Sequence, residues 1–428
     1  MVSANGLSAE NPIRRCTKDG SAITAASTAA SIVTPIASRK SFIHRDYNGV
    51  TERSLAQRSL AQRTPTGSKL AGMTSRRDFL TGAPIGLIGI AAACNRVDKT
   101  AAPLMSGAPA TAPTLTWTPQ HSDLAYTFGG AAPKHRIVSG TKIITWTEDC
   151  FDGAVKTAND LPSKVMSPGH DNPQTGPFYV EGAEPGDTIA VHILKLEPAR
   201  TYGVSSFSPG FGAIVGTDRT AVLGPDLPET SWRYDLDAAR TAAKVSSLDG
   251  KYTWSVPLAP FLGCLGVAPA MSEVHSTIVP GPFGGNMDCW EVRAGNTVYL
   301  GVNVPGALVS FGDGHYAMGE GEIMGAAIEG AMNVEVFIEL IKKQPTPVPR
   351  IENANEIMFV GSGRPLEDAA RVAFKAMVQW VQKTSGMREL DAYQFISQNS
   401  KAPIVQLVDP EYTVLVKLDK ARVPAAAK

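Results

Sequence analysis

The sequence predicts a mainly β protein, of the β-sandwich or barrel-like α+β class, that ends in a pair of helices. Forty glycines and 31 prolines accompany an aromatic content of only 7%, a composition typical of short strands joined by many turns. Short runs of alternating apolar and polar residues fill the chain from residue 116 onward. Two later segments carry apolar residues at helical spacing instead.

The first part of the chain is predicted to carry an export signal rather than a folded domain. Residues 73–94 read MTSRRDFLTGAPIGLIGIAAAC, an Arg pair followed by a short apolar stretch, as in twin-arginine export signals. We expect the twin-arginine machinery to export the protein to the periplasm, with either cleavage after the small residues or a lipid anchor on Cys94. Residues 1–72 are expected to be a disordered extension or spurious upstream translation, and residues 95–115 a flexible linker.

The body of the chain, residues 116–428, begins with strand patterns. KIITWTE at residues 142–148 alternates as a half-buried strand does. Residues 177–198 predict two strands around an Ala-Glu-Pro-Gly-Asp turn, and residues 294–315 repeat that form with Gly295-Asn296 as the turn. MNVEVFIELI at residues 332–341 predicts a further strand with one face in water.

The end of the chain is predicted to form two helices and a last strand. Residues 365–384 place Ala373, Met377 and other apolar side chains at helical spacing, with Glu367 and Asp368 in the first turn, where the helix dipole favours acids. RELDAYQFISQN at residues 388–399 predicts a second amphipathic helix. YTVLVKL at residues 412–418 predicts the last strand.

Charge and cysteine content exclude several classes of function. Lys plus Arg and Asp plus Glu both number 40, so no net charge attracts nucleic acid, and a small uncharged substrate fits better. The five cysteines form no CxxC pair. The sequence therefore carries neither a zinc-ribbon nor a thioredoxin-like motif.

Acidic residues and histidines collect in glycine-rich loops after the predicted strands. Asp149 lies in TEDCFDG, Asp288 ends GGNMD, and His315 lies in FGDGHYAMGEGEIMG. Carboxylates and an imidazole gathered at strand ends can bind a divalent ion such as zinc or calcium. We therefore predict that Asp149, Asp288 and His315 hold a divalent metal ion.

Four segments together resemble one known family. NPQTGPFYVEGAEPGD, GGNMD, VPGALVSFGDGHYAMGEGEIMGAAIE and DAYQFIS are similar, in order and spacing, to segments of the acetamidase/formamidase family, and the resemblance runs from about residue 116 to the C-terminus. It implies hydrolysis of a short aliphatic amide to carboxylate and ammonia, on a largely β fold that assembles into homo-oligomers. HYAMGEGE departs from the HAxQGDGE that is common in the family, which affects the choice of substrate.

The chemistry of amide hydrolysis suggests roles for further residues. Water must be deprotonated and the leaving nitrogen protonated, so Glu322 or Glu181 is expected to act as general base and then acid, beside a catalytic Asp288. The tetrahedral oxyanion needs hydrogen-bond donors. Candidates for the substrate and oxyanion site are Gly284, Gly285, Asn286, Gly312 and Gly314.

Two alternatives remain open at the level of sequence. Cys289 follows Asp288 directly and could be the nucleophile of a cysteine-dependent amidase. The chain could also be an exported binding protein that keeps the amidase scaffold without turnover, because the HYAMGEGE segment is altered.

Overall fold

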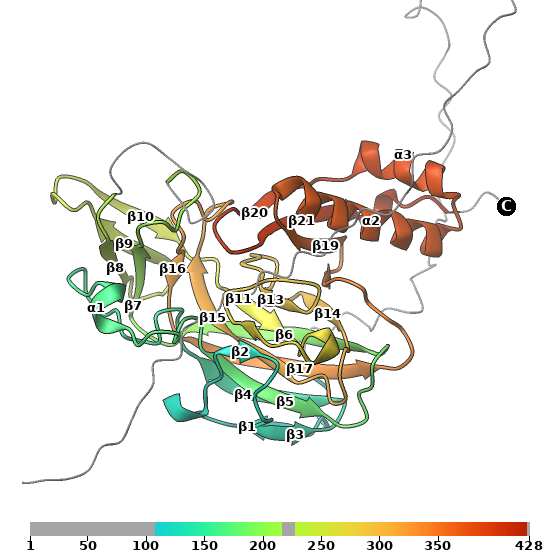
Figure 1. The fold of residues 1–428 in the computed structure, drawn as a ribbon, viewed down its shortest axis with the longest axis horizontal. Coiled ribbons are helices and arrows are strands. Elements are labelled where there is room, and N and C mark those ends of the chain that lie inside the picture. Colours follow the sequence, from blue (N-terminus) through green and yellow to red (C-terminus); the bar gives the residue numbers. More distant parts are fainter. Residues whose placement is uncertain (1–107, 216–226, 426–428) are drawn as a thin grey trace, which may run out of the picture. The chain divides into compact units, whose positions relative to one another are not determined.

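The computed structural model describes residues 108–215 and 227–425 (Figure 1). The elements it defines lie within the unit Ile88–Lys428. The predicted extension (residues 1–72), the export signal with Cys94 (73–94) and the start of the predicted linker (95–107) lie outside the described residues. Within the described ranges, no helix has the length and apolar character needed to cross a membrane.

Strands dominate the described part of the chain, as predicted, and most of them form two large sheets. The first sheet has nine strands, with β4, β17 and β6 as its longest antiparallel part. From edge to edge its strands are β1 (Thr114–Thr116), β4 (Thr141–Thr147), β17 (Met332–Ile341), β6 (Thr188–Pro198), β14 (Thr297–Gly301), β18 (Arg350–Glu352), β19 (Glu356–Gly363), β21 (Tyr412–Asp419) and β20 (Ile404–Gln406).

The second sheet has ten strands and contains the residues that matter most for function. Its main path is β10 (Thr253–Pro257), β9 (Ala242–Ser246), β8 (Thr230–Leu236), β7 (Tyr202–Phe207), β16 (Ile328–Glu329), β15 (Val309–Ala317), β11 (Phe261–Gly266) and β13 (Gly284–Asn286). Beside β15 lies β5 (Gln174–Val180), which also pairs with β3 (His135–Ile137). A separate two-stranded ribbon joins β2 (Thr127–Phe128) to β12 (His275–Ser276).

Two links carry the chain from one sheet to the other. Residues 177–198 form two strands around the predicted turn, but these strands, β5 and β6, belong to different sheets. In residues 294–315 the predicted turn position was wrong: Gly295 and Asn296 precede β14, and residues 302–308 link β14 to β15 of the other sheet. Each sheet has an apolar face that must be covered, and such crossings place the faces against each other. The main core cluster contains residues of both sheets, among them Ile143, Val191 and Val336 from the first and Phe178, Leu262 and Phe311 from the second.

The predicted helical pair is confirmed as α2 (Leu366–Ser385) and α3 (Glu389–Asn399), which lie beside β19 and β21 in Figure 1. Ala373, Met377 and Val381 of α2 are buried in a core of their own with residues of β21. The helix ends at Gly386, whose φ of 77° is the left-handed conformation that glycine adopts without strain. Short helical turns complete the described structure: α1 (Pro162–Val165), η1 (His121–Asp123), η2 (Ala270–Ser272) and η3 (Lys420–Arg422).

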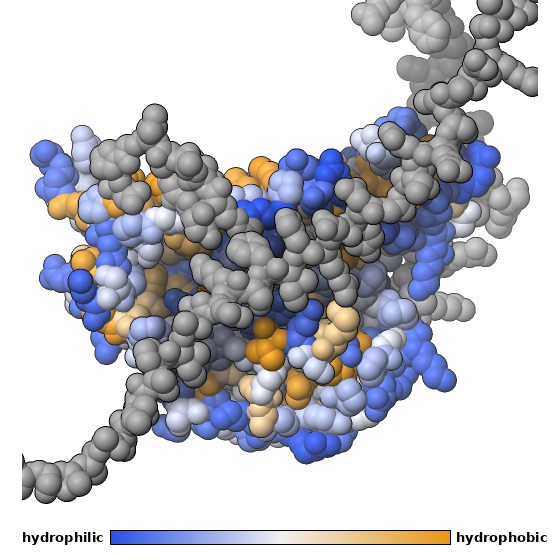
Figure 2. Space-filling model, in the orientation of Figure 1, coloured by the Kyte–Doolittle hydropathy of each residue, from blue (hydrophilic) through white to orange (hydrophobic). Residues whose placement is uncertain are grey.

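The strand that positions the candidate site is entirely buried. All nine residues of β15 are buried, including its polar residues Asp313 and His315. On the face of the molecule drawn in Figure 2, hydrophobic residues form small groups among hydrophilic ones. Because ionisable groups belong in water unless they are paired or bind a ligand, the buried ones on β15 identify the region to examine for function.

Candidate active site

Five ionisable side chains gather where β11, β13, β15 and β16 meet in the second sheet. Asp313 and His315 lie on β15, Glu329 lies on β16, Asp288 follows β13, and Glu322 follows β15. We call these residues the acid–histidine cluster. None is more than 7% exposed, so the cluster is an interior feature of the second sheet.

The imidazole of His315 is the centre of the cluster. Its Nε2 atom lies 3.3 Å from Asp313 Oδ1, 3.3 Å from Glu329 Oε2 and 3.7 Å from Asp288 Oδ1. Ligand atoms of His315, Glu322 and Glu329 also lie within 4.8 Å of one another. Of the predicted site residues, the structure therefore brings Asp288, His315 and Glu322 together.

The backbone at the cluster adopts conformations that non-glycine residues rarely take. The φ angles of Asp288, Asp313 and Glu322 are 49°, 56° and 45°, and that of the adjacent Asn172 is 48°. Each such left-handed residue costs on the order of 1–2 kcal/mol, and strain of this kind is concentrated at functional sites. The fold therefore maintains an unfavourable local geometry that aims these side chains at one point.

Several buried polar atoms of the cluster have no hydrogen-bond partner among the described residues. They are Asp288 Oδ1 and Oδ2, Asp313 Oδ1, Glu329 Oε2 and His315 Nδ1. Carboxylate neighbours cannot satisfy one another unless a proton is shared between them. An unpaired charge in the interior is costly, so these atoms are suited to a cation or a polar ligand.

Gly263 on β11 leaves the space that such a ligand needs. A Cβ atom built there would lie 2.3 Å from Asp313 Oδ2, 2.7 Å from Asp288 Oδ1 and 2.7 Å from His315 Nε2. Three groups of residues have ligand atoms within 4.8 Å of one another: Asp288 with Asp313 and His315; His315 with Glu322 and Glu329; and Cys150 with Asp313 and Glu329. Carboxylate, imidazole and thiol donors are the set that zinc accepts, and carboxylates alone suit calcium.

Burial and the closeness of several carboxylates shift the pKa values of the cluster. Burial lowers the pKa of His315, but the charges of Glu329 and Asp313 outweigh burial and raise that pKa to about 10. Burial raises the pKa of Asp288 to about 6 against the opposing charge of His315. Burial, followed by the charge of Asp288, raises the pKa of Glu322 well above its ordinary value. The cluster therefore favours bound protons or a cation over free negative charge.

Side-chain amides hold carboxylates of the site in place by hydrogen bonds. Asn172 Nδ2 donates to Asn286 Oδ1 (2.9 Å) and to Asp313 Oδ2 (3.3 Å), and Asn286 Nδ2 donates to Asp409 Oδ2 (3.0 Å). The thiol of Cys264 also donates to Asn286 Oδ1 (2.8 Å). Asn286 was predicted as an oxyanion donor, but its side-chain amide donates to Asp409 instead and so helps to position the acids of the site.

The predicted oxyanion glycines have packing roles in the structure. A Cβ at Gly312 would lie 2.3 Å from Pro173 O, and one at Gly314 would lie 2.4 Å from Gly330 O. Both residues pair with β11 within the ladder of β15. Glycine is needed there because neighbouring backbone approaches too closely for any side chain.

Gly284 and Gly285 begin the short strand β13, which leads to Asp288. Their φ angles are 94° and 84°, and a Cβ at either would lie 2.3 Å from a backbone oxygen, of Leu265 and of Val279 respectively. The amide of Gly284 already donates to Gly281 O at 3.0 Å. These glycines therefore place Asp288 rather than offering a free donor at position 284.

Asp149, a predicted metal ligand, has both carboxylate oxygens occupied. Oδ2 accepts from Arg200 Nη1 at 2.6 Å, and Oδ1 accepts the amides of Phe151 and Gly153 at 3.0 Å each. Arg200 Nη2 also donates to Glu148 at 2.7 Å. Burial, with Glu148 beside it, raises the pKa of Asp149 to about 7, because one guanidinium serves two buried carboxylates. The structure brings the next residue, Cys150, to the cluster in its place.

Glu181, a predicted proton shuttle, is not part of the cluster. It follows β5 at the turn between the sheets, is 42% exposed, and accepts from Arg136 Nε at 2.6 Å. The hydrogen bond from Arg136 is the main reason why the pKa of Glu181 lies below its ordinary value. Of the two predicted shuttles, Glu322 is the one in the site.

Cys289 lies in the main hydrophobic core and is fully buried. Burial raises the pKa of its thiol to about 12, so the reactive thiolate is not accessible near neutral pH. The geometry therefore gives no support to the nucleophile hypothesis for Cys289.

Sequence reasoning missed several residues of the site. Asn172 and Glu329 were the first and last residues of two quoted segments but were given no role, and Asp409 lay outside every quoted segment. Asp409 contacts the site through Asn286, 123 residues earlier in the chain. The one local signal was an acid within or directly after an apolar run, as for Glu329 in AIEG and Asp409 in VDP.

Comparison with known proteins agrees with this architecture. Residues 131–276 and 270–417 match the model of the acetamidase/formamidase family. The crystal structure of an acetamidase from Yersinia enterocolitica has a TM-score of 0.68 and 36% sequence identity, and the match covers 73% of this chain and 94% of that one.

Two curated relatives are more distant and match in part. The chain is 26% identical over 245 residues to the acetamidase of Mycolicibacterium smegmatis, which covers 46% of this chain and 59% of the relative. It is 28% identical over 245 residues to the formamidase of Methylophilus methylotrophus, which covers 45% of this chain and 58% of the relative. Both matches thus span less than two thirds of the relative's length, whereas the family model and the crystal structure match most of the β-rich body. The chain belongs to the acetamidase/formamidase family.

Proposed function

We propose that this protein hydrolyses short linear amides, such as formamide and acetamide, to a carboxylate and ammonia. The observation that carries the proposal is the buried acid–histidine cluster with its unpartnered carboxylate atoms, in a member of the acetamidase/formamidase family. The low exposure of the cluster favours small substrates, because a long amide could not reach it without displacing the core around it.

The residues that would hold a divalent metal ion are Asp288, Asp313 and His315. Their ligand atoms lie within 4.8 Å of one another, buried oxygens of both acids lack partners, and Gly263 leaves room between them. When bound, such an ion supplies Lewis-acid polarisation of the amide carbonyl. Zinc fits the mixed oxygen and nitrogen donors, and calcium fits the acids.

Glu322 is the proton carrier in this proposal. Burial and neighbouring negative charge raise its pKa well above the ordinary value, which favours the protonated carboxyl. A neutral carboxyl beside the scissile bond can donate that proton to the leaving nitrogen, and an amide nitrogen must be protonated before it departs. Attack of water on the carbonyl comes first and forms the tetrahedral adduct; as the Glu322 proton passes to the leaving nitrogen, the carboxylate takes the proton that the water gives up, so that Glu322 ends the cycle protonated as it began.

Ammonia release tests the function directly. Purified full chain should release ammonia from formamide, acetamide or propionamide, the release should stop after chelation, and one divalent ion should restore it. His315→Gln should lose activity, whereas His275→Gln, which changes a histidine paired with Glu273 outside the cluster, should not. Release that ignores chelation but stops with a thiol reagent would overturn metal activation, and absence of release from every amide would favour a non-catalytic binding protein.

Export and assembly belong to the same proposal. The Arg pair and apolar stretch of residues 73–94 support export to the periplasm through the twin-arginine route, with or without a lipid on Cys94. Replacing both Arg76 and Arg77 by Lys should retain the protein inside the cell, as followed by fractionation. The resemblance to the family implies a homo-oligomer, and light scattering of the purified chain would measure its size.

A further inference from the structure

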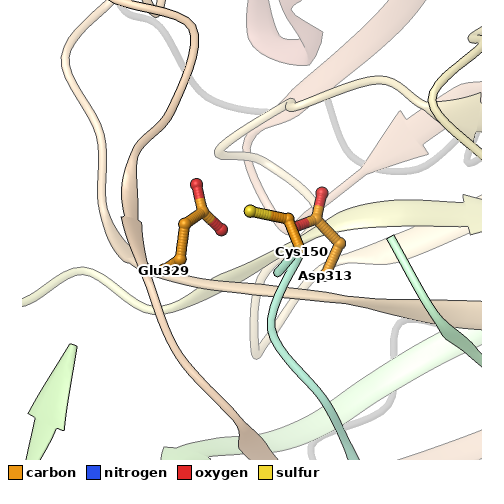
Figure 3. A group of neighbouring side chains, drawn as sticks. All are labelled: Cys150, Asp313 and Glu329. Atoms are coloured by element: carbon orange, nitrogen blue, oxygen red, sulfur yellow. The ribbon is translucent and has the colours of Figure 1, made fainter. Parts of the chain in front are cut away.

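We propose that the site binds a second divalent ion, of the zinc class, held by Cys150, Asp313 and Glu329. The inference extends the proposed function in one respect, since it adds an ion beside the one expected at His315. Ligand atoms of these three residues lie within 4.8 Å of one another. Figure 3 shows the Cys150 sulfur directed between the carboxylates of Glu329 and Asp313.

Unpartnered atoms point into this part of the site. Asp313 Oδ1 and Glu329 Oε2 have no hydrogen-bond partner among the described residues, and both side chains are about 99% buried, at 1% exposure. The other oxygen of each acid is occupied: Asp313 Oδ2 accepts from Asn172 at 3.3 Å, and Glu329 Oε1 accepts the amide of Ala327 at 2.7 Å. The fold thus fixes one oxygen of each carboxylate by a hydrogen bond, and the other oxygen, 3.3 Å from His315 Nε2 in both cases, is available to a metal ion.

One ion does not reach both His315 and Cys150, which lie at opposite ends of the set of possible ligands. Asp313 and Glu329 each belong to a group with His315 and to the group with Cys150, but in the described part of the chain no group of three contains both Cys150 and His315. Zinc bonds of about 2.0–2.3 Å bring ligand atoms close together. Two ions that share bridging carboxylates, as in two-metal sites with ions about 3.5–4 Å apart, would use both ends.

Charge supports the second ion as well. Asp409 adds a fifth carboxyl group behind the cluster, where it is 2% exposed, and His315 is the one base among these six side chains. When all five carboxyl groups are ionised, a single divalent ion and a charged His315 leave negative charge in excess in a buried site, which is costly. A second divalent ion reduces that excess.

The loop that carries Cys150 is held in place for this role. Asp149 accepts the amides of Phe151 and Gly153 and the guanidinium of Arg200, and the carbonyl of Cys150 accepts the amide of Asn172 at 3.0 Å. The backbone that carries the thiol is therefore held in place, with the sulfur between the carboxylates of Glu329 and Asp313 in Figure 3. A thiolate ligand selects zinc over calcium or magnesium, which gives the chemical class of the ion.

Metal content and cobalt spectroscopy test the proposal on the full chain. After loading with zinc, wild type should hold about two ions per chain and Cys150→Ser about one. The cobalt form of wild type should show a thiolate-to-cobalt charge-transfer band that Cys150→Ser loses. Cys289→Ala, which removes a thiol from the core outside the cluster, should keep both the second ion and the band.

Other outcomes overturn the second ion. One ion in both wild type and Cys150→Ser without a thiolate band, or two ions in both, would exclude Cys150 as a ligand. If Cys150→Ser fails to fold, mass spectrometry of wild type gives the answer, because zinc should slow alkylation of Cys150 and leave that of a denatured control unchanged; equal alkylation with and without zinc would refute the site. Ammonia release with a single ion would sink only this inference, and two ions without ammonia release would sink only the amidase activity.

Discussion

His315 Nε2 lies 3.3 Å from Asp313 Oδ1 because the two residues are two positions apart on the same buried strand. Side chains at that spacing point to one face of a sheet, and here Gly263, on the neighbouring β11, leaves that face open. An acid, a base and an empty volume are thereby brought together by two adjacent strands. The rest of the site is added around this pair.

Gly263→Ala should remove activity while the protein still folds. The added methyl carbon would sit 2.3 Å from Asp313 Oδ2, so the acids and His315 must move apart, and displacement by about 1 Å costs on the order of 100-fold in rate. Gly263 lies in a strand without positive φ, so alanine suits its backbone. Ammonia release and thermal unfolding measure the two effects.

Gly319→Ala is the matched control for that variant. A Cβ at Gly319 meets nothing within 4 Å, and its φ is not positive. Activity should therefore stay close to that of wild type. Equal loss in both variants would mean that the open volume beside Gly263 has no special role.

Arg200→Met should destabilise the protein strongly. Arg200 donates to both Glu148 and Asp149, each of which is 1% exposed, and removal of one partner from a buried ion pair costs about 3–5 kcal/mol. Denaturant unfolding would measure the loss. Adding Glu148→Gln and Asp149→Asn to Arg200→Met should recover part of it, since the uncompensated charges disappear; no recovery would assign the loss to packing of the arginine.

Local sequence patterns predicted the elements but not their partners. The strand β4 and the helix α2 follow from periodicities that lie within the segments themselves. Which strands pair is decided by contacts between residues far apart in the chain. The turn between β5 and β6 therefore looked like a hairpin, although it links two sheets.

The site was predictable where acids stood beside glycines and not elsewhere. Asp288, His315 and Glu322 were selected on that basis and lie together. Asp149 looked equivalent, but Arg200, 51 residues later, takes its carboxylate. Glu329 also stands beside a glycine, Gly330, but it was given no role, because its part in the site depends on burial and on neighbours from β15, which only the fold supplies.

Cys289→Ala should leave amide hydrolysis nearly intact. The thiol is fully buried in the core and its pKa is raised to about 12, so we do not expect it to act as a nucleophile. Loss of the sulfur should cost stability of about 1 kcal/mol. The measurement is kcat/KM for acetamide, corrected for the folded fraction; a variant that is folded and inactive would restore the cysteine mechanism.

Glu291→Gln should destabilise the protein near neutral pH and much less in acid. Burial acts to raise the pKa of Glu291, but the hydrogen bond from Lys417 Nζ (2.6 Å) and the charge of Arg293 bring that pKa below 4.5. A depressed carboxyl pKa contributes stability above the unfolded value, and this contribution is lost as pH falls through the folded value. The variant should therefore lose about 1–3 kcal/mol of unfolding free energy above pH 4.5.

The pH course of that difference separates charge from packing. Denaturant unfolding of wild type and Glu291→Gln should converge below the folded pKa, because wild-type Glu291 is then neutral as well. Glu197→Gln, which breaks an exposed pair with Lys195, should change little at any pH, since solvent screens such pairs. A difference between wild type and Glu291→Gln that stays constant as pH falls would instead assign the loss to the contact that Glu291 makes with Asn296, because that contact does not depend on the charge of Lys417.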